Sequence, residues 1–505
     1  MKIFNCEQIR EIDAYTIKHN PVASIDLMER AAYLLFKWIT GRFGRSDHFI
    51  VFIGPGNNGG DGLALARMMA EKDYSIEVYY IKFTEKTSSD WEQNRERLEN
   101  ETKVPLKYLT STEQLPLFSP GDIIIDAIFG SGLNHIVDGL PAGIIMQINQ
   151  SDSIKISIDI PSGLFGENNS KNSYNSVVKA DFTLSFQFPK LSFLFAENEQ
   201  YTGEWIILPI GLNSTAIRNS VTPYFLLEKS DVIPVLKNRK KFDHKGIFGH
   251  GLLVAGSFGK MGAAILGAKA ALRTGLGLLT CHIPSEGNII LQTTVPEAMV
   301  ETDNSEKFIS DNLETDKFSA VGIGPGLGTD HESQKVLHNL LMTCKKPMVI
   351  DADALNILSL NRKWFSLLNE NIILTPHPKE FERLAGPTDD SFTRLNNQLE
   401  FSKKYNCIVV LKGAYTSVTT PAGRVYFNST GNPGMATGGS GDVLTGMILS
   451  LLAQGYSPEN AALAGVYLHG LAGDIAVEKS CFESILASDI INEIGDAFNR
   501  LKKGE

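Results

Sequence analysis

The stretch that decides the fold is FIVFIGPGNNGGDGLALARMMAEK (residues 49–72), which joins an apolar run, a glycine-rich turn and a helical segment. The run FIVFI is typical of a strand buried on both faces, and GLALARMMAEK has helical spacing of its apolar residues. A turn that leads from a buried strand into a helix presents free backbone N–H groups and the positive end of the helix dipole. The stretch therefore predicts an α/β fold with an anion-accepting turn at the sheet edge.

Segments around this stretch repeat the alternation of strands and helices. Residues 7–45 and 88–100 have helical patterns, and the strand-containing segments are IEVYYI (76–81), DIIIDAIFGSG (122–132) and IKISIDIPSG (154–163). Short, continuously apolar strands that alternate with helices indicate a parallel sheet covered on both faces. We expect a Rossmann-like parallel-sheet domain here.

The pattern lapses between residues 213 and 245, where polar NSTAIRNSVTPYF is followed by basic KNRKKFDHKG. We place the domain boundary in this region, with one domain over residues 1–220 and another over 221–505. A second α/β series begins at residue 246, with strands in GLLVAGS, LLTCHIP, SAVGIGPGLG, PMVIDADAL, NIILTPHPKE, CIVVLKG and TSVTT. Helical segments such as AAILGAKAALRT and GDVLTGMILSLLAQ lie between these strands, and no internal sequence repeat relates the two domains.

Composition excludes several functional classes. The chain has 505 residues, 43% of them hydrophobic, and a formal net charge of −10, which argues against non-specific nucleic-acid binding. Five cysteines without a CxxC pair indicate reduced thiols. Neither a signal peptide nor an apolar run of about 18–20 residues is present, so we expect a cytoplasmic protein without a membrane partner.

The first glycine-rich turn allows two interpretations. Gly54, Gly56 and Gly59 satisfy GxGxxG, and Glu77 follows at about the distance expected of a ribose-binding acid, which favours a dinucleotide-dependent dehydrogenase. However, Asp61 would repel a pyrophosphate. Adjacent Asn57 and Asn58 are more typical of a ligand pocket with oxygens for a hard cation.

Three acids follow or end strands of the predicted sheet. Asp61 lies in the first turn, Asp126 in DAIFGSGL (126–133), and Asp159 in DIPSGL (159–164), which also contains Ser162. Ligands of open α/β sheets bind at the carboxyl ends of the strands. We therefore expect one site that contains all three acids.

Together with LMERAA (27–32), these motifs resemble the NAD(P)H-hydrate epimerase domain, a Rossmann-like fold that interconverts the R and S hydrates NADHX and NADPHX. The resemblance implies a potassium site formed by Asn58, Asp126 and Ser162. Epimerisation at C6 of the nicotinamide ring needs a proton donor and acceptor, for which Asp159 and Asp126 are both candidates. The hydrate-binding residues that the resemblance implies are Asn57, Asn58, Gly59, Gly60, Asp61, Gly130, Ser131, Gly132, Leu133, Asn134 and Asp159.

A second glycine-rich loop, GNPGMATGGSGD (431–442), precedes the helical segment VLTGMILSLLAQ. Its N–H groups would form an anion hole for a phosphoryl group, and Asp442 is placed to accept a proton from a hydroxyl. A P-loop is excluded because GxxxxGK[ST] does not occur. The loop resembles the TGAGD motif of the ribokinase-like superfamily, and TPHPKE (375–380) stands where that superfamily has TPNxxE. His377 and Ala436 depart from the superfamily pattern, which argues against an ordinary sugar kinase.

GIGPGLG (322–328), DADALN (351–356), TPHPKE, LKGAYT (411–416) and the second loop together resemble the ADP-dependent NAD(P)H-hydrate dehydratases. The resemblance implies a ribokinase-like domain that uses ADP as co-substrate and Mg²⁺ to neutralise charge on the phosphates. The hydrate-contacting residues that it implies are Ala264, Gly326, His377, Pro378, Lys379, Glu380 and Asp442. The ADP-binding residues that it implies are Lys412, Gly413, Ala414, Tyr415, Thr416, Asn432, Pro433, Gly434, Met435, Ala436, Thr437, Gly438, Gly439, Ser440 and Gly441.

The leading hypothesis is thus a bifunctional repair enzyme. Asp442 would deprotonate the C6 hydroxyl, phosphate would be transferred to it from ADP, and loss of phosphate would restore the dihydropyridine ring. Two alternatives stay open: a ribokinase-like kinase of a small hydroxylated metabolite, and a first domain that is a non-catalytic interaction module. Domains of these two types commonly associate, so we expect a homo-oligomer.

Overall fold

The computed structural model describes residues 1–20 and 22–503, and the chain divides into two compact units. One unit comprises residues 2–222 with 390–392, and the other comprises Met1 with residues 223–389 and 393–505. None of the helices within the described ranges is long and apolar enough to cross a bilayer. The units are described separately.

The first unit contains a seven-stranded sheet in the order β4-β3-β2-β5-β6-β7-β8. Every neighbouring pair in it is parallel. The strands are β2 (His48–Ile53), β3 (Ser75–Ile81), β4 (Leu106–Leu109), β5 (Asp122–Ala127), β6 (Ile154–Ile158), β7 (Phe182–Phe186) and β8 (Glu204–Leu208). The order reverses beside β2 and β5, which places a topological switch point at their carboxyl ends.

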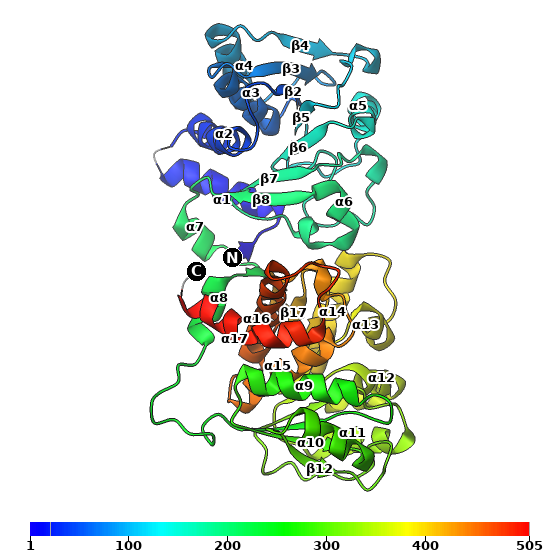
Figure 1. Cartoon of the computed structure of the whole chain (residues 1–505). Helices are drawn as coiled ribbons and strands as arrows, with labels where there is room; N and C mark the ends of the chain where they lie inside the picture. The colour runs from blue at the N-terminus through cyan, green and yellow to red at the C-terminus, as the bar shows by residue number, and fades with distance from the viewer. Residues whose placement is uncertain (21, 504–505) are drawn as a thin grey trace. The chain divides into compact units, whose positions relative to one another are not determined.

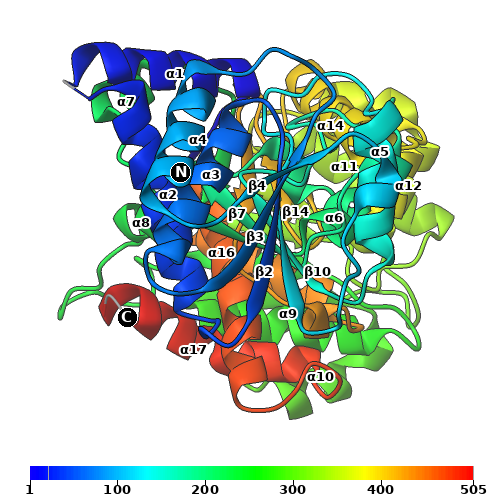
Figure 2. The ribbon, with the colours of Figure 1, turned by 90° about the horizontal axis from the view of Figure 1, so that it is seen from above.

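Helices cover both faces of this sheet, as Figures 1 and 2 show. Phe49, Val51 and Ile53 of β2 pack beneath α2 (Ser24–Thr40), α3 (Asn57–Ala70) and α4 (Ser89–Glu101). Ile50 and Phe52 of the same strand pack on the opposite face beneath α5 (Gly139–Gln150). Both faces of the strand are apolar because both are covered, which explains the continuous run FIVFI. The remaining helices are α1 (Cys6–His19), α6 (Glu199–Thr202) and α7 (Ser214–Asn219).

In the second unit the strands follow the order β9-β18-β17-β16-β15-β14-β13-β10-β11-β12. The strands are β9 (Tyr224–Leu227), β10 (His250–Val254), β11 (Leu278–Ile283), β12 (Met299–Thr302), β13 (Ala320–Ile323), β14 (Met348–Ile350), β15 (Ile372–Leu374), β16 (Ile408–Leu411), β17 (Ser417–Thr419) and β18 (Val425–Asn428). The run from β12 to β16 is parallel, whereas β17 pairs antiparallel with both of its neighbours.

This sheet also separates two apolar clusters. One face is covered by α9 (Met261–Thr274), α15 (Ser440–Ala453), α16 (Pro458–Glu478) and α17 (Ala487–Lys503). The other is covered by α11 (His331–Thr343), α12 (Ala352–Leu360), α13 (Pro378–Ala385) and α14 (Ser391–Tyr405). Figure 2 shows α9 and α17 on one side of the unit and α11 and α12 on the other. Two short helices, α8 (Lys229–Val232) and α10 (Asn288–Thr294), complete it.

The prediction of two α/β series with parallel sheets is confirmed. The antiparallel pairing of β17 was not predicted. Its cause is local: the Thr420 N–H donates to Arg424 O, and Gly423 has a φ of 82°, so a tight turn reverses the chain between β17 and β18.

Candidate functional site

The glycines of the first turn are required by backbone packing. A Cβ on Gly54 would lie 2.0 Å from Ile128 O, and a Cβ on Gly59 would lie 2.0 Å from Gly54 O. These contacts press the start of α3 against the carboxyl ends of β2 and β5. The GxGxxG spacing is therefore explained by close packing, independently of any pyrophosphate.

Glu77, the acid that the dehydrogenase alternative requires, lies near the start of β3 rather than at its carboxyl end. Its carboxylate accepts hydrogen bonds from Tyr79 Oη at 2.6 Å and Lys107 Nζ at 2.8 Å. These contacts lower the pKa of Glu77, Lys107 foremost. The residue is thus held within the strand layer, away from the edge that carries Asp61, Asp126 and Asp159.

Asp126 is fully buried at the end of β5, where hydrogen bonds surround its carboxylate. The Ser162 side chain and backbone N–H donate to it at 2.5 and 2.8 Å, and Ser157 Oγ donates at 2.7 Å. Burial nevertheless raises its pKa, and no Lys, Arg or His of the described residues pairs with it. A buried carboxylate without a cationic partner is costly, which makes this position suitable for a bound cation.

Asn58 brings further oxygen ligands to the same place. Its Nδ2 donates to Phe129 O at 3.0 Å, and its side chain lies against Gly130. Ser162 Oγ in turn accepts from the Phe129 N–H at 2.8 Å. Asn58, Asp126 and Ser162, the predicted potassium ligands, therefore converge on one turn. Amide, carbonyl, hydroxyl and carboxylate oxygens are the ligands that hard cations take.

Asp159 lies just past β6 and has a different environment from Asp126. Lys190 Nζ lies 2.7 Å from its Oδ1, and the lysine is only 1% exposed. The φ of Asp159 is 66°, a left-handed conformation that is uncommon for a residue other than glycine and often marks a functional position. Lys190 also donates to Ser185 Oγ at 3.0 Å. The sequence analysis missed Lys190, whose signal was a lysine within the apolar run FQFPKLSFLF (186–195).

Asp61 is buried in the first turn of α3 and is influenced by other acids. Its pKa is raised well above the ordinary value by burial and by the charges of Asp159, Asp13 and Asp90. Asp61 and Asp159 thus lie near each other, as predicted. The remaining expected hydrate contacts differ in exposure: Asn57, Gly132 and Asn134 are exposed, whereas the Leu133 side chain packs in the core.

In the second unit, Asp442 lies in the first turn of α15, which begins after Gly439 at a φ of 93°. Burial and the charge of Asp351, only partly offset by Lys412, raise the pKa of Asp442 to about 6. A carboxylate with a pKa near this value is ionised at neutral pH and still basic enough to accept a proton.

Lys412 connects the acids near this helix. Its Nζ lies 2.9 Å from Asp351 Oδ1 and 4.0 Å from Glu380 Oε2. Asp351 is nearly fully buried, and its other oxygen accepts from Thr445 Oγ1 at 2.6 Å. A Cβ on Gly441 would lie 3.2 Å from Lys412 Nζ, so the lysine also lies beside the glycine-rich loop. Asp351 and Thr445 were not predicted as site residues, although DADALN was recognised as a motif.

His377 begins α13 as its N-cap. Its Nδ1 accepts from the Lys379 and Glu380 N–H groups, while Glu380 accepts from the His377 N–H at 2.8 Å. Burial and the charge of Lys412 lower the pKa of His377. Burial raises the pKa of Glu380, against the opposing effect of Lys412. The reciprocal cap fixes both side chains at the carboxyl end of β15.

The loop residues expected to hold ADP lie before and at the start of α15, where Gly434 and Ser440 are buried and Pro433, Ala436 and Gly438 are exposed. Asn432 Nδ2 donates to Asp474 Oδ1 at 2.9 Å and holds one end of the loop. Ser440 lies 3.3 Å from His469 Nε2, and burial lowers the pKa of this histidine to about 4. Thr416 bonds back to Gly413, which closes the turn after β16.

Two further residues expected to contact the hydrate, Gly326 and Ala264, differ in their surroundings. Gly326 has a φ of 62° and accepts a hydrogen bond from Ser257 through its carbonyl at 2.7 Å. Ala264, in contrast, is fully buried in α9 and packs under Gly256, so its side chain does not reach the surface.

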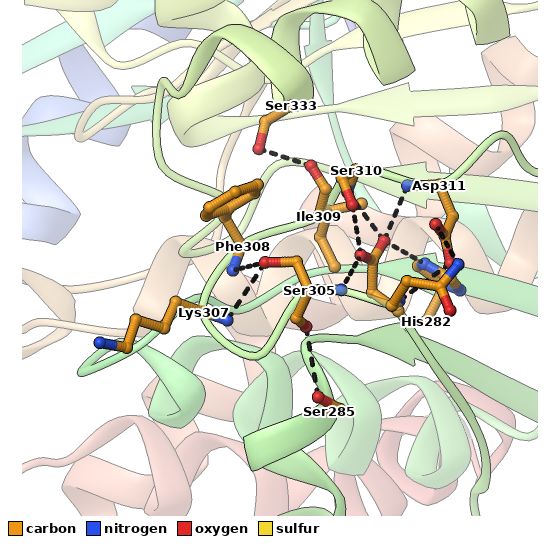
Figure 3. A network of polar contacts seen from close by, with 11 residues as sticks. His282, Ser285, Ser305, Lys307, Phe308, Ile309, Ser310, Asp311 and Ser333 are labelled. Carbon is orange, nitrogen blue, oxygen red and sulfur yellow. Dashed lines mark hydrogen bonds and ion pairs between the residues drawn. The ribbon is translucent and has the colours of Figure 1, made fainter.

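A separate polar network includes His282, Asp303 and Asp311, whose ligand atoms lie close enough together to hold a metal ion. Figure 3 shows the surroundings of this network, with His282, Ser310 and Asp311 labelled. The Asp303 carboxylate is already saturated, because His282 Nε2 lies 3.0 Å away and Ser305, Ser310 and Asp311 donate to it at 2.6–2.9 Å. Burial opposes its ionisation, but these hydrogen bonds outweigh burial and lower its pKa to about 2. The network therefore orders the loop after β12.

Comparisons with known proteins cover both units. A family model described as NAD(P)H-hydrate dehydratase matches residues 251–495, and one described as YjeF-related protein N-terminus matches residues 24–192. The bifunctional NAD(P)H-hydrate repair enzyme Nnr of Moorella thermoacetica is 32% identical over 513 residues, which cover 97% of this chain and 96% of that protein. The enzyme of the same name from Coxiella burnetii is 34% identical over 495 residues, or 97% of each chain.

Among solved structures, an ADP/ATP-dependent NAD(P)H-hydrate dehydratase from Bacillus subtilis, co-crystallised with ATP and Mg²⁺, is 29% identical. The match covers 55% of this chain and 98% of that one, with a TM-score of 0.48.

Proposed function

The chain belongs to the family of bifunctional NAD(P)H-hydrate repair enzymes, and from this premise we propose how its two units divide the work. It is a metabolite-repair enzyme that epimerises the R and S hydrates of NADH and NADPH and dehydrates the S form to NAD(P)H. Residues 2–222 carry the epimerase and residues 223–505 carry the dehydratase.

The observation that carries the dehydratase proposal is the position of Asp442. It combines a raised pKa with a place at the start of α15, directly after the glycine-rich loop. Asp442 accepts the proton of the C6 hydroxyl, whose oxygen attacks the terminal phosphoryl group of ADP and releases AMP. The C6–O bond then breaks, phosphate leaves with the electron pair, and the ring nitrogen lone pair forms the N1=C6 bond. Loss of a C5 proton restores the C5=C6 bond of the dihydropyridine.

Other residues hold the phosphates in this proposal. The backbone N–H groups of residues 437–441 receive the transferred phosphoryl group. Lys412 lies beside Gly441, where its positive charge balances the negative charge of that phosphoryl group. Glu380 is suited to organise Mg²⁺ through water, because its Oε1 lies 3.4 Å from His377 Nε2 and no closer donor to it occurs within residues 1–20 and 22–503. Mg²⁺ supplies neutralisation of the charge that develops on the phosphates. The use of ADP, with ATP as a possible substitute, is part of this proposal.

For the epimerase we assign Asp159, rather than Asp126, as a group that exchanges protons with the substrate. Asp126 is enclosed by donors from Ser157 and Ser162, whereas the Asp159 side chain retains 12% exposure. Asp126 instead belongs to the potassium site with Asn58 and Ser162. Potassium there supplies the positive charge that the buried Asp126 lacks.

A product assay tests the dehydratase against the kinase alternative. The full chain is incubated with S-NADHX, ADP and Mg²⁺, and the products are separated. We expect NADH, AMP and free phosphate in equal amounts. Accumulation of a phosphorylated hydrate without NADH would favour the kinase.

Two further assignments complete the proposal. The first unit is catalytic rather than a non-catalytic interaction module. The buried Asp159–Lys190 ion pair supports this assignment, because protein binding alone does not require a buried ion pair at this position. We also propose that the enzyme forms a homo-oligomer. Sedimentation of the purified chain at several concentrations tests this, and a monomer throughout would contradict it.

A further inference from the structure

Helix α1 places a carboxyl group where its own pattern calls for an apolar residue. The buried residues of α1 are Cys6, Ile9, Ile12 and Thr16, and the partly buried Asp13 lies between Ile9 and Thr16 at helical spacing, at the edge of this face. Ile9 and Ile12 beside it are buried in an apolar cluster with Phe188. Asp13 is therefore directed into the unit rather than toward solvent.

The helix is firmly attached on both sides of Asp13. The Cys6 N–H donates to Glu167 Oε1 at 2.6 Å, and the Cys6 side chain occupies the space beside Gly166. Near the other end, Thr16 Oγ1 accepts from the Asn213 N–H at 3.0 Å. The position of Asp13 is thus fixed by contacts that the carboxyl group does not itself make.

Asp13 Oδ1 is buried and has no hydrogen-bond partner among the described residues. A buried oxygen without a partner costs free energy, and natural proteins retain such atoms where function requires them. The charged groups that influence Asp13 belong to the proposed epimerase site. The charges of Asp159 and Lys190 affect the pKa of Asp13, and the charge of Asp13 in turn raises the pKa of Asp61.

The two carboxyl groups have opposite surroundings. Asp159 has a cation partner, Lys190, at 2.7 Å, whereas none of the residues that the structure describes forms an ion pair with Asp13. Burial and the negative charge of Asp159, partly offset by Lys190, raise the pKa of Asp13 to about 7. Carboxyl groups whose environments differ in this way commonly act as the acid and the base of one reaction.

We propose that Asp13 is the catalytic acid of the epimerase, with ion-paired Asp159 as its basic partner. The inference rests on the proposed epimerase function and adds a residue to it. The matched part of the family model begins at residue 24, so α1 and Asp13 precede it.

The step assigned to Asp13 is a reversible proton transfer. The Oδ1 proton passes to the C6 hydroxyl oxygen, the C6–O bond breaks, and water leaves with the bonding electron pair. The ring nitrogen lone pair forms the N1=C6 bond, so C6 becomes planar. Water then adds to C6 and the N1=C6 electrons return to nitrogen. Water that adds to the same face gives its surplus proton back to the Asp13 carboxylate, whereas water that adds to the opposite face gives it to Asp159, from which the proton returns to Asp13 through solvent.

The test uses the full chain and purified R-NADHX without ADP, with chromatographic measurement of the S form. Asp13→Asn keeps the shape of the side chain but cannot supply the proton, so we expect the rate of R-to-S conversion to fall at least about 100-fold. Glu11→Gln, an exposed position on the same helix, is the matched control and should stay within about twofold of wild type. Dehydration of S-NADHX with ADP, carried by the other unit, should be unchanged in both variants.

Retention of R-to-S conversion within about threefold in Asp13→Asn would overturn the assignment. If that variant loses its fold, the pH profile of the wild-type enzyme decides instead. An acid with a pKa of about 7 predicts a decline in kcat/KM above that pH, and a flat profile from about pH 6 to 9 would overturn it. A wild-type chain that does not interconvert the epimers at all would refute the proposed epimerase itself, an outcome distinct from either result with the variant.

Discussion

Replacement of Asp442 by Asn should abolish dehydration and at the same time stabilise the second unit. Loss of a general base lowers kcat by about 100- to 10,000-fold. Burial raises the pKa of Asp442 from its ordinary value of 3.8 to about 6, so the ionised carboxylate opposes folding. That shift corresponds to about 3 kcal/mol for a fully buried group, and we expect about 1–2 kcal/mol because Asp442 is partly exposed.

The sign of this effect depends on pH. Above pH 6 Asp442 is ionised in both states, and its ionisation costs more free energy in the folded chain than in the unfolded chain. Asp442→Asn therefore raises the free energy of unfolding in this pH range. Below about pH 4 both states are protonated and the advantage disappears. Wild-type dehydration should follow the ionised fraction, which is roughly 90% at pH 7 and roughly 10% at pH 5.

Two measurements check this prediction. NADH formation from S-NADHX with ADP and Mg²⁺ gives kcat from pH 5 to 8, and urea unfolding at pH 7 and pH 4 gives the free energy of unfolding. Asp489→Asn, at an acid in the first turn of α17, is the matched control. Full dehydration by Asp442→Asn would refute the assignment of the base, and a loss of stability at pH 7 would refute the electrostatic reasoning.

Three further predictions follow from individual contacts. Gly439→Ala should lower the free energy of unfolding, measured by urea titration, by about 1–3 kcal/mol, because the residue has a φ of 93° and a Cβ would collide with a leucine of α9. The control Gly438→Ala, where a Cβ meets nothing within 4 Å, should leave the free energy of unfolding nearly unchanged. Asp126→Asn should raise the K⁺ concentration for half-maximal epimerisation at least about tenfold, and an unchanged K⁺ dependence would remove Asp126 from the cation site. Lys190→Met should leave Asp159 without its cation and reduce the rate of R-to-S conversion at least about tenfold, while S-NADHX dehydration continues. Equal loss of both activities would instead indicate that the variant unfolds.

The sequence was sufficient to predict those parts of the fold in which residues of one type, such as the apolar residues of a buried strand, recur in a regular pattern. The apolar run 49–53 predicted a strand covered on both faces, since its odd and even residues pack in separate clusters. The positions of Asp61, Asp126 and Asp159 after successive strands predicted one shared edge, because the carboxyl ends of parallel strands lie together. The grouping of Asn58, Asp126 and Ser162 came instead from the family resemblance.

Other features depend on partners that the sequence does not reveal. Asp126 and Asp159 both follow strands and both precede glycine turns, but only the structure surrounds one with serine donors and pairs the other with Lys190. The pattern of α1 did contain a signal, since Asp13 lies next to Ile12 at the edge of the buried face of the helix. The role of Asp13 could be inferred only from the structure, which shows that the charges of Asp159, after β6, and Lys190, after β7, act on it.

The central claim is that one chain makes both hydrates usable, and a single time course tests it most directly. A mixture of R- and S-NADHX is incubated with the full chain, Mg²⁺ and ADP, and the absorbance of restored NADH is followed to its end point. We expect NADH equal to the sum of both epimers for the wild type, and NADH equal to the initial S form alone for Asp159→Ala. A wild-type reaction that stopped at the S fraction, after correction for spontaneous epimerisation, would contradict it.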